Sequence, residues 1–150
     1  MEFDENNEVE EPDSEDAVEI YSKWAVWGFS IFFGTIFGGV LLMSNLKAVG
    51  LKKAANTVLI FSILYFIGSG IIVGVTGMTG SYIPLFFNVA GAAILTGYFF
   101  NKYFPEDDYY PKSIGKPLII SIVISVAVFL IIYYGMKYTG HGDYFKQFQK

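Results

Sequence analysis

Four long apolar runs, with no charged side chain in their interiors, constrain the fold of this chain more than any other feature. They cover approximately residues 24–44, 57–76, 82–104 and 117–136. Each has about twenty residues, which matches a hydrocarbon core about 30 Å thick. Only a helix or a closed barrel satisfies the backbone without water, and runs of this length are helical. The sequence therefore predicts an all-α integral membrane protein with four transmembrane helices arranged as two hairpins.

Composition and aromatic placement agree with a membrane protein. Hydrophobic residues make up 53% of the chain and aromatic residues 19%, which is more apolar surface than a water-soluble fold of this size can bury. Aromatic side chains gather at the ends of the runs, as in the interfacial belts of membrane proteins. These residues are Tyr21, Trp24, Trp27, Tyr98, Tyr103, Phe104, Tyr133, Tyr134 and Tyr138.

The charged residues divide the chain into three parts. Ten of the fourteen acidic residues fall within residues 1–19, so we expect a disordered acidic N-terminal tail there. Residues 20–138 then form the four-helix transmembrane domain, and residues 139–150 form a short polar C-terminal tail. The loops between the apolar runs are too short to form a separate soluble domain.

The lysines predict an orientation in the membrane. Six of them fall in the two connections after the first and third runs, namely Lys47, Lys52, Lys53, Lys102, Lys112 and Lys116, against four elsewhere. The positive-inside rule places these loops in the cytoplasm, so with four spans both termini lie outside it. The chain has no Arg and is rich in Lys, Ile, Phe and Asn, as in AT-rich bacterial genomes. We therefore expect a multi-pass protein of the bacterial inner (cytoplasmic) membrane.

Small residues recur at four-residue spacing in the apolar runs, which places them on one helix face. The helix-packing candidates are Ser30, Gly34, Gly38, Gly70, Gly74, Ala93 and Gly97. Such faces let helix backbones approach closely in a membrane. A glycine-lined pore is the functional alternative.

Asn88 is the strongly polar side chain in the interior of the runs, since Asn101 and Lys102 lie at the end of the third run. Its amide can bind a permeating solute, or it can form a hydrogen bond to a neighbouring helix. The hydrogen bond between helices is the simpler interpretation.

The residues for several kinds of chemistry are missing from the sequence. Cysteine is absent and His141 is the only histidine, whereas a zinc or copper site needs three or four ligands. No buried charge is available for a proton relay, and no intramembrane serine has a nearby base. We therefore expect no enzyme activity, catalytic residue, metal site or cofactor, and no basic patch is large enough for nucleic acid.

The segment 33–54 resembles a known kind of membrane protein. It combines a glycine pair at Gly38 and Gly39, Asn45 at the exit of the first run, and a loop with Gly50 and Lys53. This pattern is similar to that of an uncharacterised family of small four-helix membrane proteins of Bacteroidota and related bacteria. The resemblance implies a location and an architecture but no catalytic residues.

Two functions are compatible with these observations. The first is a non-catalytic membrane protein that binds or organises a partner in the bilayer, either a second copy or another membrane protein. The second is a small transporter or channel subunit for an uncharged solute. Small-residue faces favour the first, and glycine-rich spans with Asn88 favour the second.

Overall fold

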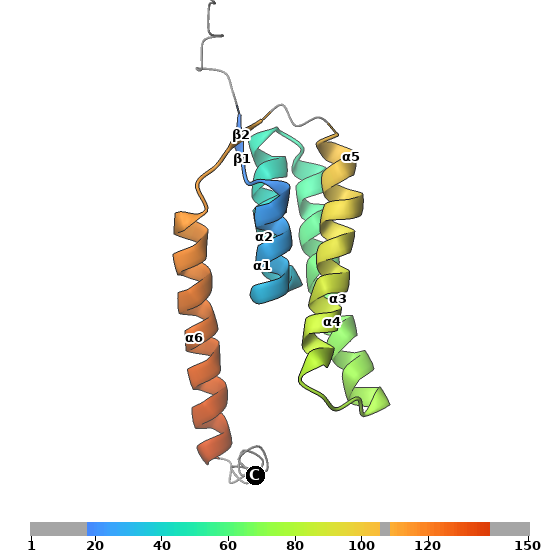
Figure 1. Cartoon of the computed structure of the whole chain (residues 1–150), viewed down its shortest axis with the longest axis vertical. Helices are drawn as coiled ribbons and strands as arrows, with labels where there is room; N and C mark the ends of the chain where they lie inside the picture. The colour runs from blue at the N-terminus through green and yellow to red at the C-terminus, as the bar shows by residue number, and fades with distance from the viewer. Residues whose placement is uncertain (1–17, 106–108, 139–150) are drawn as a thin grey trace, which may run out of the picture.

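The computed structural model describes residues 18–105 and 109–138, which are almost entirely helical (Figure 1). The two terminal tails expected from the sequence lie outside the described residues, except for Val18 and Glu19. The elements in chain order are β1 Glu19–Ile20, α1 Lys23–Phe32, α2 Thr35–Ala48, α3 Lys52–Thr76, α4 Tyr82–Ile94, the π-helix η1 Leu95–Phe100, α5 Asn101–Tyr103, β2 Tyr110–Pro111 and α6 Gly115–Tyr138.

Three helical segments of the described chain are long and apolar enough to cross a membrane. They cover Lys52–Thr76, Tyr82–Tyr103 and Gly115–Gly135. These segments correspond to the second, third and fourth apolar runs, because continuous apolar stretches of this length form helices when water is absent. The segment Tyr82–Tyr103 is continuous through α4, η1 and α5.

The first apolar run is not one continuous helix, so the fourth span expected over residues 24–44 is not confirmed. The run is divided at Phe33 and Gly34 into α1, with 10 residues, and α2, with 14 residues. At about 1.5 Å per residue, these helices are roughly 15 and 21 Å long, and neither reaches across a core of about 30 Å. Gly34 permits the break because it adopts a φ of +103°, which residues with a Cβ atom rarely adopt.

The helices α1 and α2 fold back on each other as a hairpin (Figure 1). A Cβ atom at Gly38 of α2 would lie 2.7 Å from the Val26 carbonyl oxygen of α1 and would overlap the Ser30 hydroxyl. The Ser30 hydroxyl donates to that same Val26 carbonyl, 2.7 Å away, so its polarity is satisfied within α1. Glycine on one helix and a self-satisfied serine on the other therefore allow the two backbones to touch.

Hydrogen bonds from Asn45 join the two ends of this hairpin. Its Oδ1 accepts from the Tyr21 backbone N–H and its Nδ2 donates to the Tyr21 carbonyl, both at 2.7 Å. The start of α1 and the end of α2 consequently lie side by side. The first apolar run thus begins and ends at the same end of the molecule.

All the segments that carry lysines before residue 117 meet at this end, which we call the lysine end. β1 pairs with β2 in parallel, with Glu19 opposite Tyr110, and Lys23 Nζ donates to Asn101 Oδ1 of α5 at 2.8 Å. Residues 20–23 and the loop before α6 therefore lie at the same end of the described chain. The expected orientation of the termini stays a prediction.

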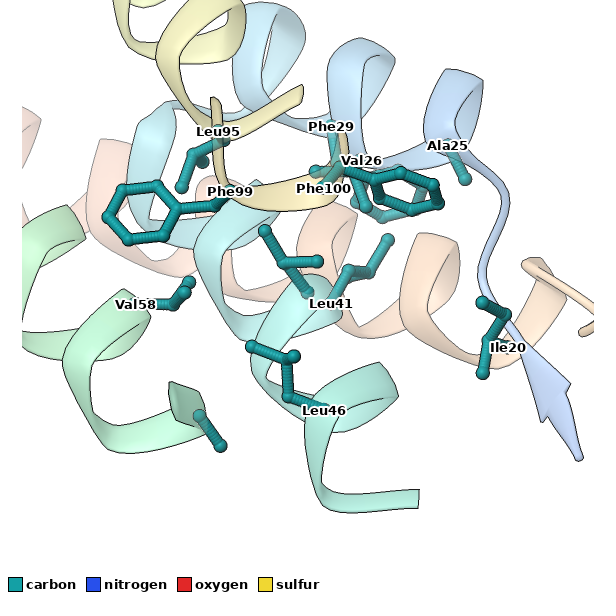
Figure 2. Close-up of a cluster of buried hydrophobic side chains, with 12 residues drawn as sticks. Ile20, Ala25, Val26, Phe29, Leu41, Leu46, Val58, Leu95, Phe99 and Phe100 are labelled. Atoms are coloured by element: carbon teal, nitrogen blue, oxygen red, sulfur yellow. The ribbon is translucent and has the colours of Figure 1, made fainter. Parts of the chain in front are cut away.

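The hydrophobic core lies in the lysine half of the molecule. Figure 2 shows side chains from α1, α2, α3 and η1 meeting there, with Phe99 and Phe100 directed into the cluster. The fully buried members include Val26, Leu42 and Val58. Beyond this cluster, the distal parts of α3, α4 and α6 expose large apolar side chains, with Val75 at 83% exposure.

The close approach of α1 and α2 predicts a selective effect of one methyl group. Gly38→Ala should lower the unfolding temperature in detergent, because overpacking a close contact costs on the order of 1–3 kcal/mol. Gly28→Ala in α1 is the matched control, since no described atom lies within 4 Å of a Cβ there. That control should be neutral or stabilising by about 1 kcal/mol, the helix-propensity gain of alanine. Equal effects of the two substitutions on the unfolding temperature would contradict the hairpin contact.

Candidate functional site

The break between α1 and α2 is the most unusual feature of the fold and the first candidate site. Gly34 and Thr35 are both buried, and α2 begins at Thr35 without a side-chain cap. Interrupted helices within membranes often carry binding sites, because they expose backbone donors and acceptors at depth. Whether the break can bind a ligand therefore depends on the residues packed around it.

Thr35 packs directly against α4. A Cβ atom at Gly91 would overlap the Thr35 hydroxyl and would lie 2.8 Å from Thr35 Cγ2 and 2.9 Å from Tyr65 Cε1. Thr35 is 1% exposed, and its Oγ1 is the buried side-chain polar atom without a hydrogen-bond partner in the described chain. This hydroxyl faces the Gly91 backbone at close range.

Asn88 ties α4 to the end of α1. Its Nδ2 donates to the Ile31 carbonyl at 3.2 Å, and the Ile31 carbonyl is one of those near the α1 terminus that lack an intrahelical partner. At the residue before Asn88, the Phe87 carbonyl accepts a hydrogen bond from the Tyr65 hydroxyl of α3 at 2.8 Å. Of the two roles predicted for Asn88, the structure places its amide in a polar contact between helices.

An apolar cleft lies between α6 and α2 and opens beside the break. Its volume is about 790 Å³, and it extends along α6 from Pro117 to Ile132. Its other wall comes from the segment between Phe33 and Leu41, with Phe66 of α3. None of the lining side chains is charged, so the cleft suits a hydrocarbon group.

The predicted helix-packing residues divide into two groups. Ser30 and Gly38 lie against each other, and Gly34 lies at the break with its nearest described neighbour at Asn88. By contrast, no described atom lies within 4 Å of a Cβ at Gly70, Gly74 or Gly97, and Ala93 is exposed. A side chain at any of the three glycines would therefore meet open space in the described chain, and Ala93 lies on an exposed face.

Two close contacts were missed by the spacing argument. Gly39 packs against Ser62, whose Cβ would lie 2.6 Å from a Cβ at Gly39, and Gly91 packs against Thr35. The signal for Gly39 was present, since Gly39 adjoins Gly38 and Ser62 is a small residue of the second run. No such signal marks Gly91, because the buried residues near it in sequence are Ala92 of α4 and Leu95 of η1, whereas the spacing pointed to Ala93 and Gly97.

The described residues contain no group of three or more His, Asp or Glu side chains close enough to hold a metal ion. His141 lies outside the described residues. The absence of enzyme activity and of a metal centre therefore stays a prediction. No protein-family model, curated protein or solved structure matches the chain.

The unpartnered Thr35 hydroxyl predicts that its removal raises stability. Thr35→Val keeps the side-chain shape and removes a buried hydroxyl without a partner, which should stabilise the fold by about 1 kcal/mol. Thr96→Val is the matched control, because the Thr96 hydroxyl is also buried but donates to the Ala92 carbonyl at 2.8 Å. Thermal unfolding in detergent measures the stability of both purified variants. A lower unfolding temperature for Thr35→Val would show that its hydroxyl binds a partner.

Proposed function

We propose that this chain is a non-catalytic membrane protein that binds a partner helix in the bilayer through the outer half of α3. The observation that carries this proposal is the open glycine face formed by Gly70 and Gly74. These residues lie one turn apart on the same side of α3, and no described side chain occupies the space beside them.

The rest of the molecule supports this use of the glycine face. Gly38, Gly39 and Gly91 are each covered by a small hydroxyl side chain of a neighbouring helix. Glycine costs about 1 kcal/mol relative to alanine within a helix, and close backbone contact between membrane helices offsets that cost. A second copy of the chain or another membrane protein would give Gly70 and Gly74 the contact that the other glycines already have.

The alternative function is a small transporter or channel subunit for an uncharged solute. A polar path through the chain would have to use Asn88, but its amide donates to the end of α1 and the nearby cleft is apolar. The glycine face therefore supports partner binding better than solute transport. Membership of the resembled bacterial family and location in the inner membrane remain parts of the proposal.

The orientation proposed here differs from the one that four spans imply. With a hairpin and three spans, seven lysines lie at the lysine end, namely Lys23, Lys47, Lys52, Lys53, Lys102, Lys112 and Lys116. Only Lys137, Lys146 and Lys150 come at or after the end of α6. The positive-inside rule then favours a cytoplasmic lysine end with the N-terminal segment, and an external end of α6.

Single cysteines test this orientation cleanly, because the chain has no cysteine of its own. In intact spheroplasts, a membrane-impermeant thiol reagent should label Ser81→Cys in the turn between α3 and α4. It should leave Ser14→Cys and Ala48→Cys unlabelled until the membrane is permeabilised. Labelling of Ser14→Cys while Ala48→Cys stays silent would place these positions on opposite sides and exclude the hairpin arrangement.

Site-specific crosslinking tests the partner face. A photoreactive side chain placed at Gly74 should crosslink to a second copy or to another membrane protein in intact membranes. The control position is Ile72, which lies about 200° around the helix from Gly74. We expect several-fold more crosslinked product from position 74. Equal yields at both positions would mean that the glycine face contacts lipid, and would contradict the proposed function.

A further inference from the structure

The cleft between α6 and α2 has an uncharged, mainly apolar lining, and one of its ends adjoins a lysine in the sequence. Pro117 marks the lysine end of the cleft, and the residue before it is the exposed Lys116. α6 begins at Gly115, so the positive end of its helix dipole lies at the same place. Lys112 lies nearby in sequence, with its Nζ 5.3 Å from the Tyr21 ring centroid.

The length of the cleft suits a hydrocarbon chain. The lining of α6 runs from Pro117 to Ile132, which is about 22 Å at 1.5 Å per residue. One leaflet contributes about half of a hydrocarbon core that is about 30 Å thick. An acyl chain that enters beside Pro117 therefore finds an apolar wall along its whole length.

Small side chains on α6 make the space for such a chain. Ser121 and Ser125 lie one turn apart and both line the cleft, opposite the segment that contains Gly34 and Phe37. Larger side chains at these two positions would either push α6 away from α2 or fill the cleft. The cleft thus depends on two residues that are neither large nor charged.

We propose that this cleft binds one acyl chain of an anionic phospholipid from the leaflet at the lysine end, with the lipid phosphate beside Lys116. In the first turn of α6, Pro117 has no N–H, the Gly115 N–H donates to Ser113 Oγ at 3.4 Å and the Leu118 N–H donates to the Ile114 carbonyl at 2.9 Å. The lysine charge and the helix dipole, rather than free N–H groups, would therefore attract the phosphate. Basic residues beside membrane helices attract anionic headgroups at the cytoplasmic surface. The segment 109–116 contains no acidic residue of its own, and the acidic residue paired with it is Glu19, opposite Tyr110. This site is distinct from the glycine face of α3 and does not depend on the proposed function.

Lipid titration followed by native mass spectrometry of the full chain tests the charge preference. Dioleoyl phosphatidylglycerol should bind at least fivefold more tightly than dioleoyl phosphatidylcholine. Lys116→Gln should weaken phosphatidylglycerol binding about fivefold, the factor expected for one lysine near an anionic membrane surface. Lys137→Gln, at the far end of α6, is the matched control and should have no effect. Equal affinities for the two lipids, or equal effects of the two lysine substitutions, would overturn the proposal.

A second pair of variants tests the cleft itself. Ser125→Phe should fill the cleft and abolish binding of both lipids, whereas Val123→Phe on the exposed side of α6 should leave binding unchanged. Glycerol phosphate, which has the headgroup charge without the chains, should not compete with phosphatidylglycerol. Effective competition would assign the site to a free phosphate ester. Loss of dimers with Ser125→Phe, without any bound lipid in the original chain, would assign the cleft to a second copy. Either result would overturn the lipid proposal.

Discussion

The contact between Gly38 and Ser30 is the interaction on which the rest of this structure depends. A polar residue in a membrane interior normally demands a partner, but Ser30 returns its hydroxyl to the Val26 carbonyl of its own helix. With its hydroxyl bonded within α1, Ser30 presents no unsatisfied polar group to α2. The backbone at Gly38 can therefore lie directly against it. Two short helices can therefore form a stable hairpin within an apolar run that is long enough for one span.

This hairpin divides the molecule into two unlike halves. In the lysine half, α1 and α2 fill the space among the longer helices, and the core around Leu42, Val58 and Phe100 is complete (Figure 2). Beyond the turn at Gly34 no element of the described chain continues the packing. The outer parts of α3, α4 and α6 consequently present their side chains to whatever surrounds them. Lipid satisfies such side chains without cost, but it does not explain the glycines at 70 and 74.

The sequence predicted three of the helices well, because each depends on a local property, namely a continuous apolar stretch of sequence. An apolar stretch of about twenty residues must form its hydrogen bonds internally, so its length and position define the helix. The hairpin is equally apolar throughout, so hydropathy cannot distinguish it from a span. Gly34 and Gly38 have the spacing of a single helix face, yet one forms a turn and the other a contact. The hairpin is closed by hydrogen bonds between the Asn45 amide and the Tyr21 backbone. These residues are 24 positions apart, so no local sequence pattern predicts their contact.

The position of α6 follows from the same constraint. A membrane helix whose hydrogen bonds are internal is stable without neighbours, so α6 does not need to pack tightly against the body. What holds it is the pairing of β1 with β2, the Lys112 backbone N–H donating to the Ile20 carbonyl at 2.8 Å, and Lys112 over the Tyr21 ring. All three contacts involve the few residues that precede α1. The segment that closes the hairpin therefore also holds the start of α6 beside the rest of the described chain.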